Sequence, residues 1–500
     1  MPKNTAARPH PGESRVTTAP NAPAADPRRW VALAVIAVST LMVVLDSTIV
    51  TIALPHAQAD LGISNADRQW AVTAYALAFG GLLLLGGRIA DFAGRKRVFL
   101  ISALGFAAAS ALGGLAVDPA MLFGARALQG AFAALLAPAG LSLLVVTFTN
   151  PKELAKAFGV YAAVQGVGGA IGLILGGVLT EYVSWRWTLL VNVPIAVAAF
   201  LAALPTLRES RAPGSRRYDI PGALLVTSGL AALVYGFTLA AEGTGWSAPS
   251  TLGLLGAGVA LLAAFVVVET RSASPLLPLR VVLDRNRGGA LLASVLIFGG
   301  LFGMLFFLTY YFQVNLDYSP IRAGLAFLPF SLGLITTAAL ASSLLPRFGP
   351  KPLLVAGATL ATLGTFWLTS LNESSSYVGS VLPIELVISI GVGIALVPLS
   401  SVAMHGIDPE DAGVGAAMLN VSQQVGGALG TAVLNTIYVS AYAGFLATNP
   451  GTAEGSLAPY LEGYRTAFTL SAILMAAALI VLILLVNARR SADPVAVPEG

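Results

Sequence analysis

The stretch WVALAVIAVSTLMVVLDSTIVTIAL, residues 30–54, decides the fold of this 500-residue chain. A transmembrane helix needs about 20 consecutive, mostly apolar residues. This stretch is longer than that, and Asp46 is its one charged residue. It is also too long for the apolar core of a signal peptide. The stretch therefore predicts a membrane-spanning helix that carries a buried carboxyl group.

The rest of the chain repeats this apolar pattern. Hydrophobic residues make up 56% of it and charged residues 10%, whereas a soluble domain carries about 25% charged residues. We therefore expect an all-α integral membrane protein with about fourteen spans, and Thr251–Glu269 is one of the short ones. The expected spans are Trp30–Leu54, Trp70–Ala90, Val98–Val117, Met121–Phe148, Ala155–Glu181, Trp187–Pro205, Pro221–Ala241, Thr251–Glu269, Gly288–Phe312, Ile321–Leu345, Pro352–Ser370, Gly379–Met404, Gly413–Ser440 and Tyr464–Asn487.

Basic residues orient these spans, because positively charged loops stay in the cytoplasm. They gather in alternate loops and beside both termini, which places both termini in the cytoplasm and requires an even number of spans. The acidic loop Asp408–Asp411 breaks the pattern. The bases on the cytoplasmic side are Arg28, Arg29, Arg95, Lys96, Arg97, Lys152, Lys156, Arg208, Arg211, Arg216, Arg217, Arg271, Arg280, Arg285, Arg287, Arg347, Lys351, Arg489 and Arg490.

Composition also excludes several classes of site. The chain has no cysteine, so it forms no disulfide and no thiolate site. Its three histidines do not have metal-ligand spacing, so we expect no metal. A nucleotide-binding Gly-Lys-Ser/Thr motif is also absent, which excludes direct ATP drive by this chain. We therefore expect that the protein has no cofactor and that the proton gradient drives transport.

The sequence contains an internal repeat, because its first half resembles its second half. VGGAIG at Val167–Gly172 matches VGGALG at Val425–Gly430, and Leu135–Pro138 matches Ala395–Pro398. The loop at Gly94–Lys96 matches Gly349–Lys351 more weakly. Transporters are often built from such repeats around a central cavity. We therefore divide the chain into a tail (1–29), a six-helix bundle (30–205), linkers with two inserted helices (206–287), a second six-helix bundle (288–487) and a second tail (488–500).

Four motifs carry a resemblance to a known family. They are LDSTIV at 45–50 with ALP at 53–55, GRIADFAGRK at 87–96, RALQG at 126–130 and GGAIGLILGG at 168–177. Together with the helix count they resemble the 14-helix drug/proton antiporters of the major facilitator superfamily. The resemblance covers nearly the whole chain after Trp30. It implies the major facilitator fold and multidrug or antibiotic efflux by proton antiport.

The resemblance also assigns two groups of residues. The loop motif, with Gly87, Asp91, Gly94, Arg95 and Lys96, looks like a gate that clasps the cytoplasmic helix ends, although it also serves as a positively charged anchor. The antiporter-motif helix carries Gly168, Gly169, Gly172, Gly176 and Gly177, and small residues let helices approach closely. Leu173 stands where the family usually has Pro, which weakens the inference of antiport. Phe92 stands where the family usually has a basic residue.

Asp46 and Arg126 are the candidate proton-coupling pair. A charge at the bilayer centre costs about 2.5–3.5 kcal/mol on insertion scales. Asp46 lies roughly 12 Å and Arg126 roughly 9 Å inside the outer ends of their spans, so the two can meet if spans one and four adjoin. A fixed ion pair and a titrating pair remain equally open. Glu385 is the other embedded acid and is either a second proton or cation-substrate site or an interfacial group.

Candidates for the substrate cavity are intramembrane amides and aromatic rings. Gln165, Asn420, Gln423 and Gln424 are amides that are costly to expose to lipid. Phe298, Phe302, Phe306 and Tyr310 recur on one helix face, which faces either lipid or the cavity. An uptake symporter, or an exporter of one metabolite, is the nearest alternative function, and a channel or an integral-membrane enzyme fits less well. We expect a monomer in the inner (plasma) membrane whose partners are a small-molecule substrate, protons and lipid, with no nucleic acid.

The topology is directly testable. Reporter tags at both termini and in the 206–220 loop should all be cytoplasmic, because the basic loops hold these segments on that side. Accessibility of the tags to an impermeant reagent in intact cells measures this. A C-terminus that the reagent labels from outside would contradict fourteen spans.

Overall fold

The computed structural model describes residues 28–211, 219–241, 245–272, 275–277, 279–407, 412–453 and 456–487. Within these residues fourteen helices are long and apolar enough to cross a membrane. The predicted count is therefore confirmed, and the short span at Thr251–Glu269 lies inside a 23-residue helix. The protein is a multi-pass membrane protein. The predicted loop residues Arg216, Arg217, Asp408–Asp411, Arg489 and Arg490 lie outside the described residues.

The first bundle is formed by the amino-terminal spans. Its helices are α1 (Arg29–Leu61), α2 (Trp70–Ala93), α3 (Arg95–Gly114), α4 (Pro119–Thr147), α5 (Pro151–Tyr182), α6 (Trp187–Leu190) and α7 (Asn192–Thr206). We call it the N-half.

The second bundle begins after an inserted pair, α8 (Ile220–Leu239) and α9 (Pro249–Arg271), and the short α10 (Leu279–Val282). We call it the C-half. Its helices are α11 (Arg285–Tyr310), η2 (Tyr311–Asn315), α12 (Pro320–Ala326), α13 (Leu328–Phe348), α14 (Pro350–Trp367), η3 (Leu368–Ser370), η4 (Tyr377–Val381), α15 (Leu382–Met404), α16 (Ala412–Thr448) and α17 (Ala458–Leu485).

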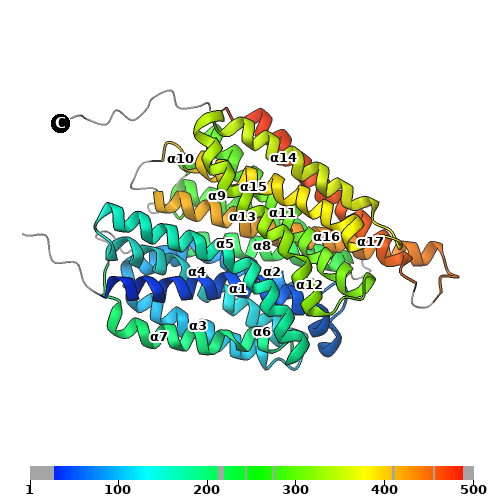
Figure 1. The fold of residues 1–500 in the computed structure, drawn as a ribbon, viewed down its shortest axis with the longest axis horizontal. Helices are drawn as coiled ribbons and strands as arrows, with labels where there is room; N and C mark the ends of the chain where they lie inside the picture. The colour runs from blue at the N-terminus through cyan, green and yellow to red at the C-terminus, as the bar shows by residue number, and fades with distance from the viewer. Residues whose placement is uncertain are drawn as a thin grey trace, which may run out of the picture.

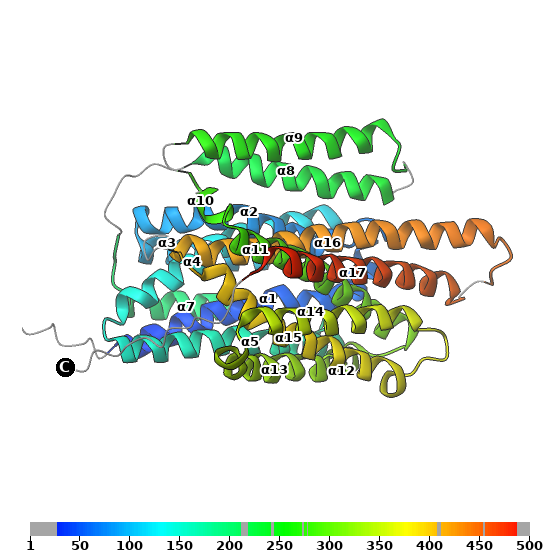
Figure 2. The ribbon, with the colours of Figure 1, turned by 90° about the horizontal axis from the view of Figure 1, so that it is seen from above.

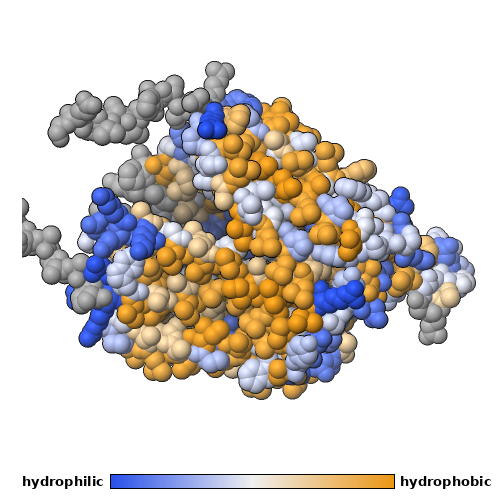
Figure 3. Space-filling view, in the orientation of Figure 1, coloured by the Kyte–Doolittle hydropathy of each residue, from blue (hydrophilic) through white to orange (hydrophobic). Residues whose placement is uncertain are grey.

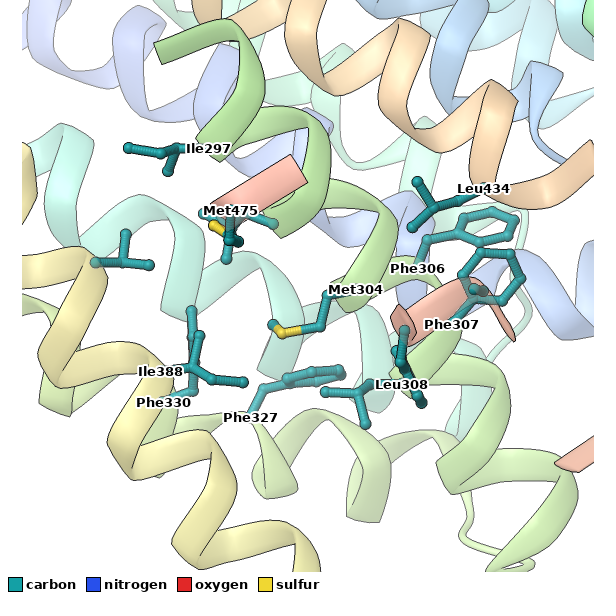
Figure 4. Close-up of a cluster of buried hydrophobic side chains, with 14 of the residues drawn as sticks. Ile297, Met304, Phe306, Phe307, Leu308, Phe327, Phe330, Ile388, Leu434 and Met475 are labelled. Carbon is teal, nitrogen blue, oxygen red and sulfur yellow. The ribbon is translucent and has the colours of Figure 1, made fainter. Parts of the chain in front are cut away.

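The two halves lie side by side with their helices roughly parallel to the long axis (Figure 1). They meet along two seams, α2 against α16 and α5 against α12 and α13. The inserted helices lie outside both bundles, with α8 on α2 and α16 and with α9 packed on α8 (Figure 2). Aromatic and aliphatic side chains of α11, α13, α15, α16 and α17 form a core in the C-half (Figure 4).

The polar groups separate toward the two ends of this long axis. A broad apolar surface lies between polar ends in the space-filling view (Figure 3), as a bilayer requires. The end where α1 begins and α17 ends carries most of the described bases, and we call it the basic end. We call the other the opposite end; it carries Arg68, Arg186, Arg322 and Arg465.

Equivalent contacts recur in both halves. Lys96 Nζ donates to Leu204 O at 2.6 Å, and Lys351 Nζ donates to Ile483 O at 3.1 Å. Each lysine follows a glycine of positive φ, +118° at Gly94 and +75° at Gly349, a conformation that glycine adopts without steric cost. In each half, a base in the loop after the second helix therefore binds the end of the sixth helix.

Glycines set how closely the first and fifth spans of each half pack. A Cβ on Gly172 would lie 2.0 Å from Thr48 Oγ1, and one on Gly176 would lie 2.7 Å from the Ile49 carbonyl oxygen of α1. In the C-half, a Cβ on Gly430 would lie 2.3 Å from Gly299 of α11. The VGG repeat found in the sequence therefore corresponds to one helix-packing arrangement used twice.

Two helices extend further at their C-terminal ends than the sequence predicted. The helix predicted to end at Leu54 continues through Pro55 to Leu61, and the helix predicted to end at Ser440 continues to Thr448. An apolar run ends where the lipid ends, whereas backbone hydrogen bonds continue the helix into water. Proline is tolerated in a transmembrane helix because neighbouring groups satisfy the freed carbonyl.

The glycine packing predicts a position-specific effect of one methyl group. Gly176→Ala should destabilise the protein by about 1–3 kcal/mol, because the new Cβ overlaps the backbone of α1. Gly169→Ala is the matched control on the same helix, because no atom lies within 4 Å of its Cβ position. The thermal unfolding midpoints of the purified variants measure this. Equal midpoints for the two variants would show that α1 and α5 do not pack this closely.

Candidate proton and substrate site

A fully buried ion pair lies in the centre of the N-half. Arg126 Nη1 of α4 lies 2.6 Å from Asp46 Oδ2 of α1, and the two side chains are 1% and 0% exposed. The condition under which the two residues can meet, that spans one and four adjoin, is fulfilled in the structure. Two opposite charges in a low-dielectric interior attract strongly, but both have lost their hydration. The pair is stable only if further hydrogen bonds satisfy the remaining polar atoms.

Neighbouring amides supply those bonds. Gln129 Nε2 donates to Asp46 Oδ1 at 2.9 Å, and Asn192 Nδ2 of α7 donates to the same oxygen at 2.8 Å. Gln129 also accepts from Arg126 at 3.0 Å and donates to Ser110 of α3 at 2.7 Å. The carboxylate thus has three donors from two helices.

The second helix holds the guanidinium from its other side. Arg126 Nε donates to the Ala71 carbonyl at 2.9 Å. The Tyr75 ring lies against Arg126, with 4.5 Å between Cζ and the ring centroid. Tyr75 also lines the cavity described next, so a single aromatic ring separates the ion pair from the space open to a substrate.

A cavity of about 220 Å³ lies between the halves. Its walls come from α1, α2, α4, α5, α11 and α16. Among the described residues that line it, none is an acid or a base. The lining residues are Thr40, Val43, Val44, Ser47, Tyr75, Phe79, Leu83, Ala137, Pro138, Leu141, Tyr161, Gln165, Phe302, Gly413, Ala416, Ala417, Asn420, Gln423 and Gln424.

The structure places five of the seven predicted cavity residues in this wall. Four are the amides, which come from α5 and α16, and the fifth is Phe302 of α11. Phe306 and Tyr310 lie elsewhere: both are buried near the opposite end and face Arg68 instead of the cavity. Residues on one face of α11 therefore reach both the cavity and the surroundings of Arg68, because a helix of 26 residues extends across most of the membrane.

Contacts between the halves close the opposite end. Tyr310 donates to Gln58 at 2.7 Å, and Gln313 Nε2 donates to the Ile52 carbonyl at 2.9 Å. The Ile321 amide donates to Glu181 at 3.0 Å. The cavity lies on the basic-end side of this seal. In this conformation the described contacts between the halves therefore separate the cavity from the opposite end.

The antiporter-motif helix takes part in the seal. A Cβ on Gly177 would lie 2.6 Å from Ile321 Cα, and one on Gly324 would lie 2.5 Å from the Leu173 carbonyl oxygen. Leu173 is the residue that replaces the usual proline. Its backbone therefore forms part of the close contact between α5 and α12, while Gly168, Gly172 and Gly176 face α1.

The loop motif binds mainly within its own half. Asp91 Oδ1 accepts from Arg95 at 2.8 Å, and Glu209 accepts from the amides of Lys96 and Arg97 at the start of α3. Arg88 donates to the Pro275 carbonyl at 2.8 Å, outside the N-half. Gly87 makes only ordinary contact with Pro138.

Glu385 is buried in the C-half without a counter-ion. It lies in the first turn of α15, is 0% exposed, and among the described residues no group hydrogen-bonds to either carboxyl oxygen. The Tyr377 side chain faces it. A buried carboxyl group without a partner is costly in an apolar interior. Glu385 does not line the cavity.

Several residues of the site had no role in the sequence-based prediction. Gln129 stands three residues after Arg126, on the same helix face, and Asn192 is an isolated amide in an apolar span. Their polarity inside apolar runs was a usable signal. Tyr75 and Tyr161 carried no such signal, because tyrosine is also common at membrane interfaces.

Comparison with known proteins shows similarity to the Major Facilitator Superfamily and to antibiotic resistance and export proteins. The family model of the Major Facilitator Superfamily matches residues 36–431. The puromycin resistance protein pur8 of Streptomyces alboniger is 47% identical over 472 residues, which cover 94% of this chain and 93% of that protein. The cephamycin export protein CmcT of Amycolatopsis lactamdurans is 40% identical over 467 residues, 93% of this chain and 94% of that protein.

A more distant relative and a solved structure extend the comparison. The multidrug efflux pump LfrA of Mycolicibacterium smegmatis is 31% identical over 415 residues, 83% of this chain and 82% of that protein. The crystal structure of a bacterial homologue of the human lysosomal transporter Spinster superposes with a TM-score of 0.66 at 16% identity, covering 93% of this chain and 98% of that chain. At this identity the likeness concerns the fold alone.

The buried pair predicts a non-additive response to substitution. Arg126→Gln should destabilise the protein by about 3–5 kcal/mol, because it leaves the Asp46 carboxylate buried without a counter-ion. Asp46→Asn/Arg126→Gln should be less destabilised than Arg126→Gln alone, because no uncompensated charge remains. Unfolding midpoints in mixed micelles measure the difference. A double variant as unstable as the sum of the single variants would show that the two side chains act independently.

Proposed function

The chain belongs to the major facilitator superfamily, and we propose from this premise that it exports small amphipathic or cationic compounds in exchange for protons. One observation carries the proposal: a buried carboxylate–guanidinium pair lies one tyrosine ring away from a cavity between two halves. Such an arrangement can link the charge state of a buried acid to the position of two bundles. Alternating access between them moves the substrate.

The exchange of protons depends on the stability of the pair. While the cavity faces the basic end, Arg126, Gln129 and Asn192 donate to the Asp46 carboxylate. When the opposite end opens, α1 rearranges against α4 and these donors separate from Asp46. Asp46 then takes up a proton from that side, which removes its negative charge and releases Arg126 from the pair. Return to the present conformation restores the donors, and the proton leaves toward the basic end.

The cavity walls support amphipathic substrates. Tyr75, Phe79, Tyr161 and Phe302 present aromatic faces, and such faces attract organic cations. Gln165, Asn420, Gln423 and Gln424 supply hydrogen-bond donors and acceptors without charge. The relatives are described by their names as resistance or export proteins for puromycin and cephamycin, and as a multidrug efflux pump. These names support export of an antibiotic-like compound by this chain too.

The two ends of the protein supply the gates in this proposal. The opposite end closes through α5 and α12, which Gly177 and Gly324 allow to touch. When that end opens, the basic end must close, and Asp91 with Arg95 then clasps the helix ends of the C-half. We assign the basic end to the cytoplasm, because positively charged loops stay there. Export from the cytoplasm through the plasma membrane follows from this orientation.

Glu385 is the second candidate for proton transfer. Its burial without a counter-ion among the described residues supports this role and distinguishes it from Asp46, which is paired with Arg126. Uptake by symport is the alternative function on this fold. The direction of proton movement relative to substrate separates the two functions, since antiport acidifies the compartment that the substrate leaves.

Reconstituted proteoliposomes test the function. A panel containing puromycin, ethidium and a neutral amphipathic antibiotic is added to vesicles with an imposed pH gradient. The proposal expects accumulation of at least one compound in the direction opposite to proton flow, detected together with a substrate-dependent change of internal pH. Substrate and protons moving in the same direction would assign symport. No movement of protons with any transported compound would remove proton coupling.

Asp46→Asn is the sharpest test of the coupling acid. Asparagine keeps the shape of aspartate and one of its two acceptor oxygens but cannot titrate, so the variant should insert with reduced stability and lose accumulation against a gradient. Arg126→Lys, which loses the planar fork of donors, should shift the pH dependence or slow turnover. Asp60→Asn is the control, because Asp60 pairs with Arg186 outside this network. If Asp46→Asn accumulates substrate at the wild-type rate and pH dependence, Asp46 is structural and Glu385→Gln becomes the test of coupling.

A further inference from the structure

A second buried arginine lies at the opposite end without an acidic partner. Arg68, just before α2, is 3% exposed and takes part in none of the ion pairs found among the described residues. Its Nε donates to Asn435 Oδ1 of α16 at 3.2 Å, and its Nη2 has no hydrogen-bond partner. A buried charge needs compensation, and here aromatic rings provide it.

Four rings of the C-half surround the guanidinium. Arg68 Cζ lies 4.0 Å from the ring centroid of Tyr310 and 4.7 Å from that of Tyr438. The corresponding distances to Phe306 and Phe307 are 5.5 and 5.8 Å. All four lie within the range in which a ring face attracts a cation, about 6 Å. The pocket therefore matches a compact, delocalised positive charge.

These rings also pack against one another, in addition to their contacts with Arg68, and Tyr310 donates a hydrogen bond to Gln58 of α1. Phe306 and Tyr310 lie 5.3 Å apart, and Phe307 and Tyr438 lie 5.0 Å apart. Tyr464 of α17 lies 5.2 Å from Tyr438, and its hydroxyl has no hydrogen-bond partner. Phe306 and Phe307 are neighbours on α11, close to α16 (Figure 4). We call these five residues the aromatic cage, and every one of them belongs to the C-half.

Arg68 and the aromatic cage therefore belong to different bodies. When the opposite end opens, Arg68 leaves with the N-half, while the cage stays assembled on α11, α16 and α17. An intact pocket built for a delocalised cation then faces the opening. Aromatic cages of this kind recognise quaternary ammonium groups.

We propose that the aromatic cage is a second binding site for organic cations, filled by Arg68 while the opposite end is closed and by the exported cation while that end is open. Return of Arg68 displaces the cation as the seal re-forms. The Arg68 side chain thus competes with the exported cation for the aromatic cage. This inference rests on the proposed export of cationic compounds and locates a site on their route, distinct from the cavity at the basic end.

Binding of a charged probe and its uncharged isostere tests the cage. The probes are benzyltrimethylammonium and neopentylbenzene, titrated into wild-type protein and variants in identical nanodiscs, so that partition into lipid cancels. Arg68→Gln removes the internal competitor and should raise the affinity for benzyltrimethylammonium about five-fold or more. Neopentylbenzene should show no comparable gain. Arg68→Gln/Tyr310→Leu should lose the gain, because the nearest ring is gone.

The matched control is Arg322→Gln. Arg322 also lies over a tyrosine at the opposite end, 3.8 Å from the ring centroid of Tyr318, but it is exposed and meets a single ring. Its substitution should leave both affinities unchanged. The proposal is overturned if Arg68→Gln leaves cation affinity unchanged or lower, if both probes gain equally, or if the double variant keeps the gain. Arg68 would then be a clamp between the halves.

A second variant covers the case in which Arg68→Gln does not fold. Tyr310→Leu retains Arg68 and its bond to Asn435, and it should slow export of a cation more than export of a neutral compound in proteoliposomes. Equal slowing of both would also overturn the proposal. The binding result is independent of proton coupling. A cation-specific gain in Arg68→Gln with no proton-linked transport in the wild type would therefore uphold the cage while removing the proposed function.

Discussion

Every buried polar group in this protein must be satisfied inside an apolar solvent, and the Asp46–Arg126 pair is where that constraint is strictest. Neither side chain can reach water, so the pair depends on Gln129, Asn192 and the Ala71 carbonyl. These groups come from helices α2, α4 and α7. Four helices of the N-half, α1, α2, α4 and α7, therefore contribute groups to one network around the Asp46 carboxylate. Loss of that negative charge would change the hydrogen bonds of all four helices.

The two halves solve the same packing problem with the same devices. Glycines of α5 receive α1, and glycines of α16 receive α11. A lysine in each half binds the end of the sixth span. Because each half is held together by its own contacts, the halves can move as bodies, and the seams between them carry the contacts that must break. The seal of the opposite end contains few direct hydrogen bonds and much close backbone contact.

Arg126 and Arg68 are both buried and are stabilised in different ways. Arg126 pairs with a carboxylate within its own half. Arg68 has aromatic rings on the other half, so its state depends on whether the halves touch. In the proposed transport cycle, Arg126 therefore responds to the proton on Asp46, whereas Arg68 responds to separation of the two halves. Among the described residues, the lining of the cavity contains no acidic or basic side chain, which leaves a substrate's own charge to be recognised by rings and amides.

The sequence by itself determined the number of spans, the internal repeat, the family and the buried acids, because each depends on local composition. Twenty apolar residues need lipid wherever they fold, and a lone Asp46 or Glu385 in such a run is conspicuous. Helix ends such as Leu61 were missed because hydropathy marks the lipid boundary and not the last hydrogen bond. Only the tertiary structure decided which polar groups meet. Gln129 and Asn192 converge on Asp46 from different helices, Phe302 reaches the cavity while Tyr310 covers Arg68, and Glu385 stays unpaired. These outcomes depend on helix rotation and on the state of the seams, which side-chain composition along one helix does not encode.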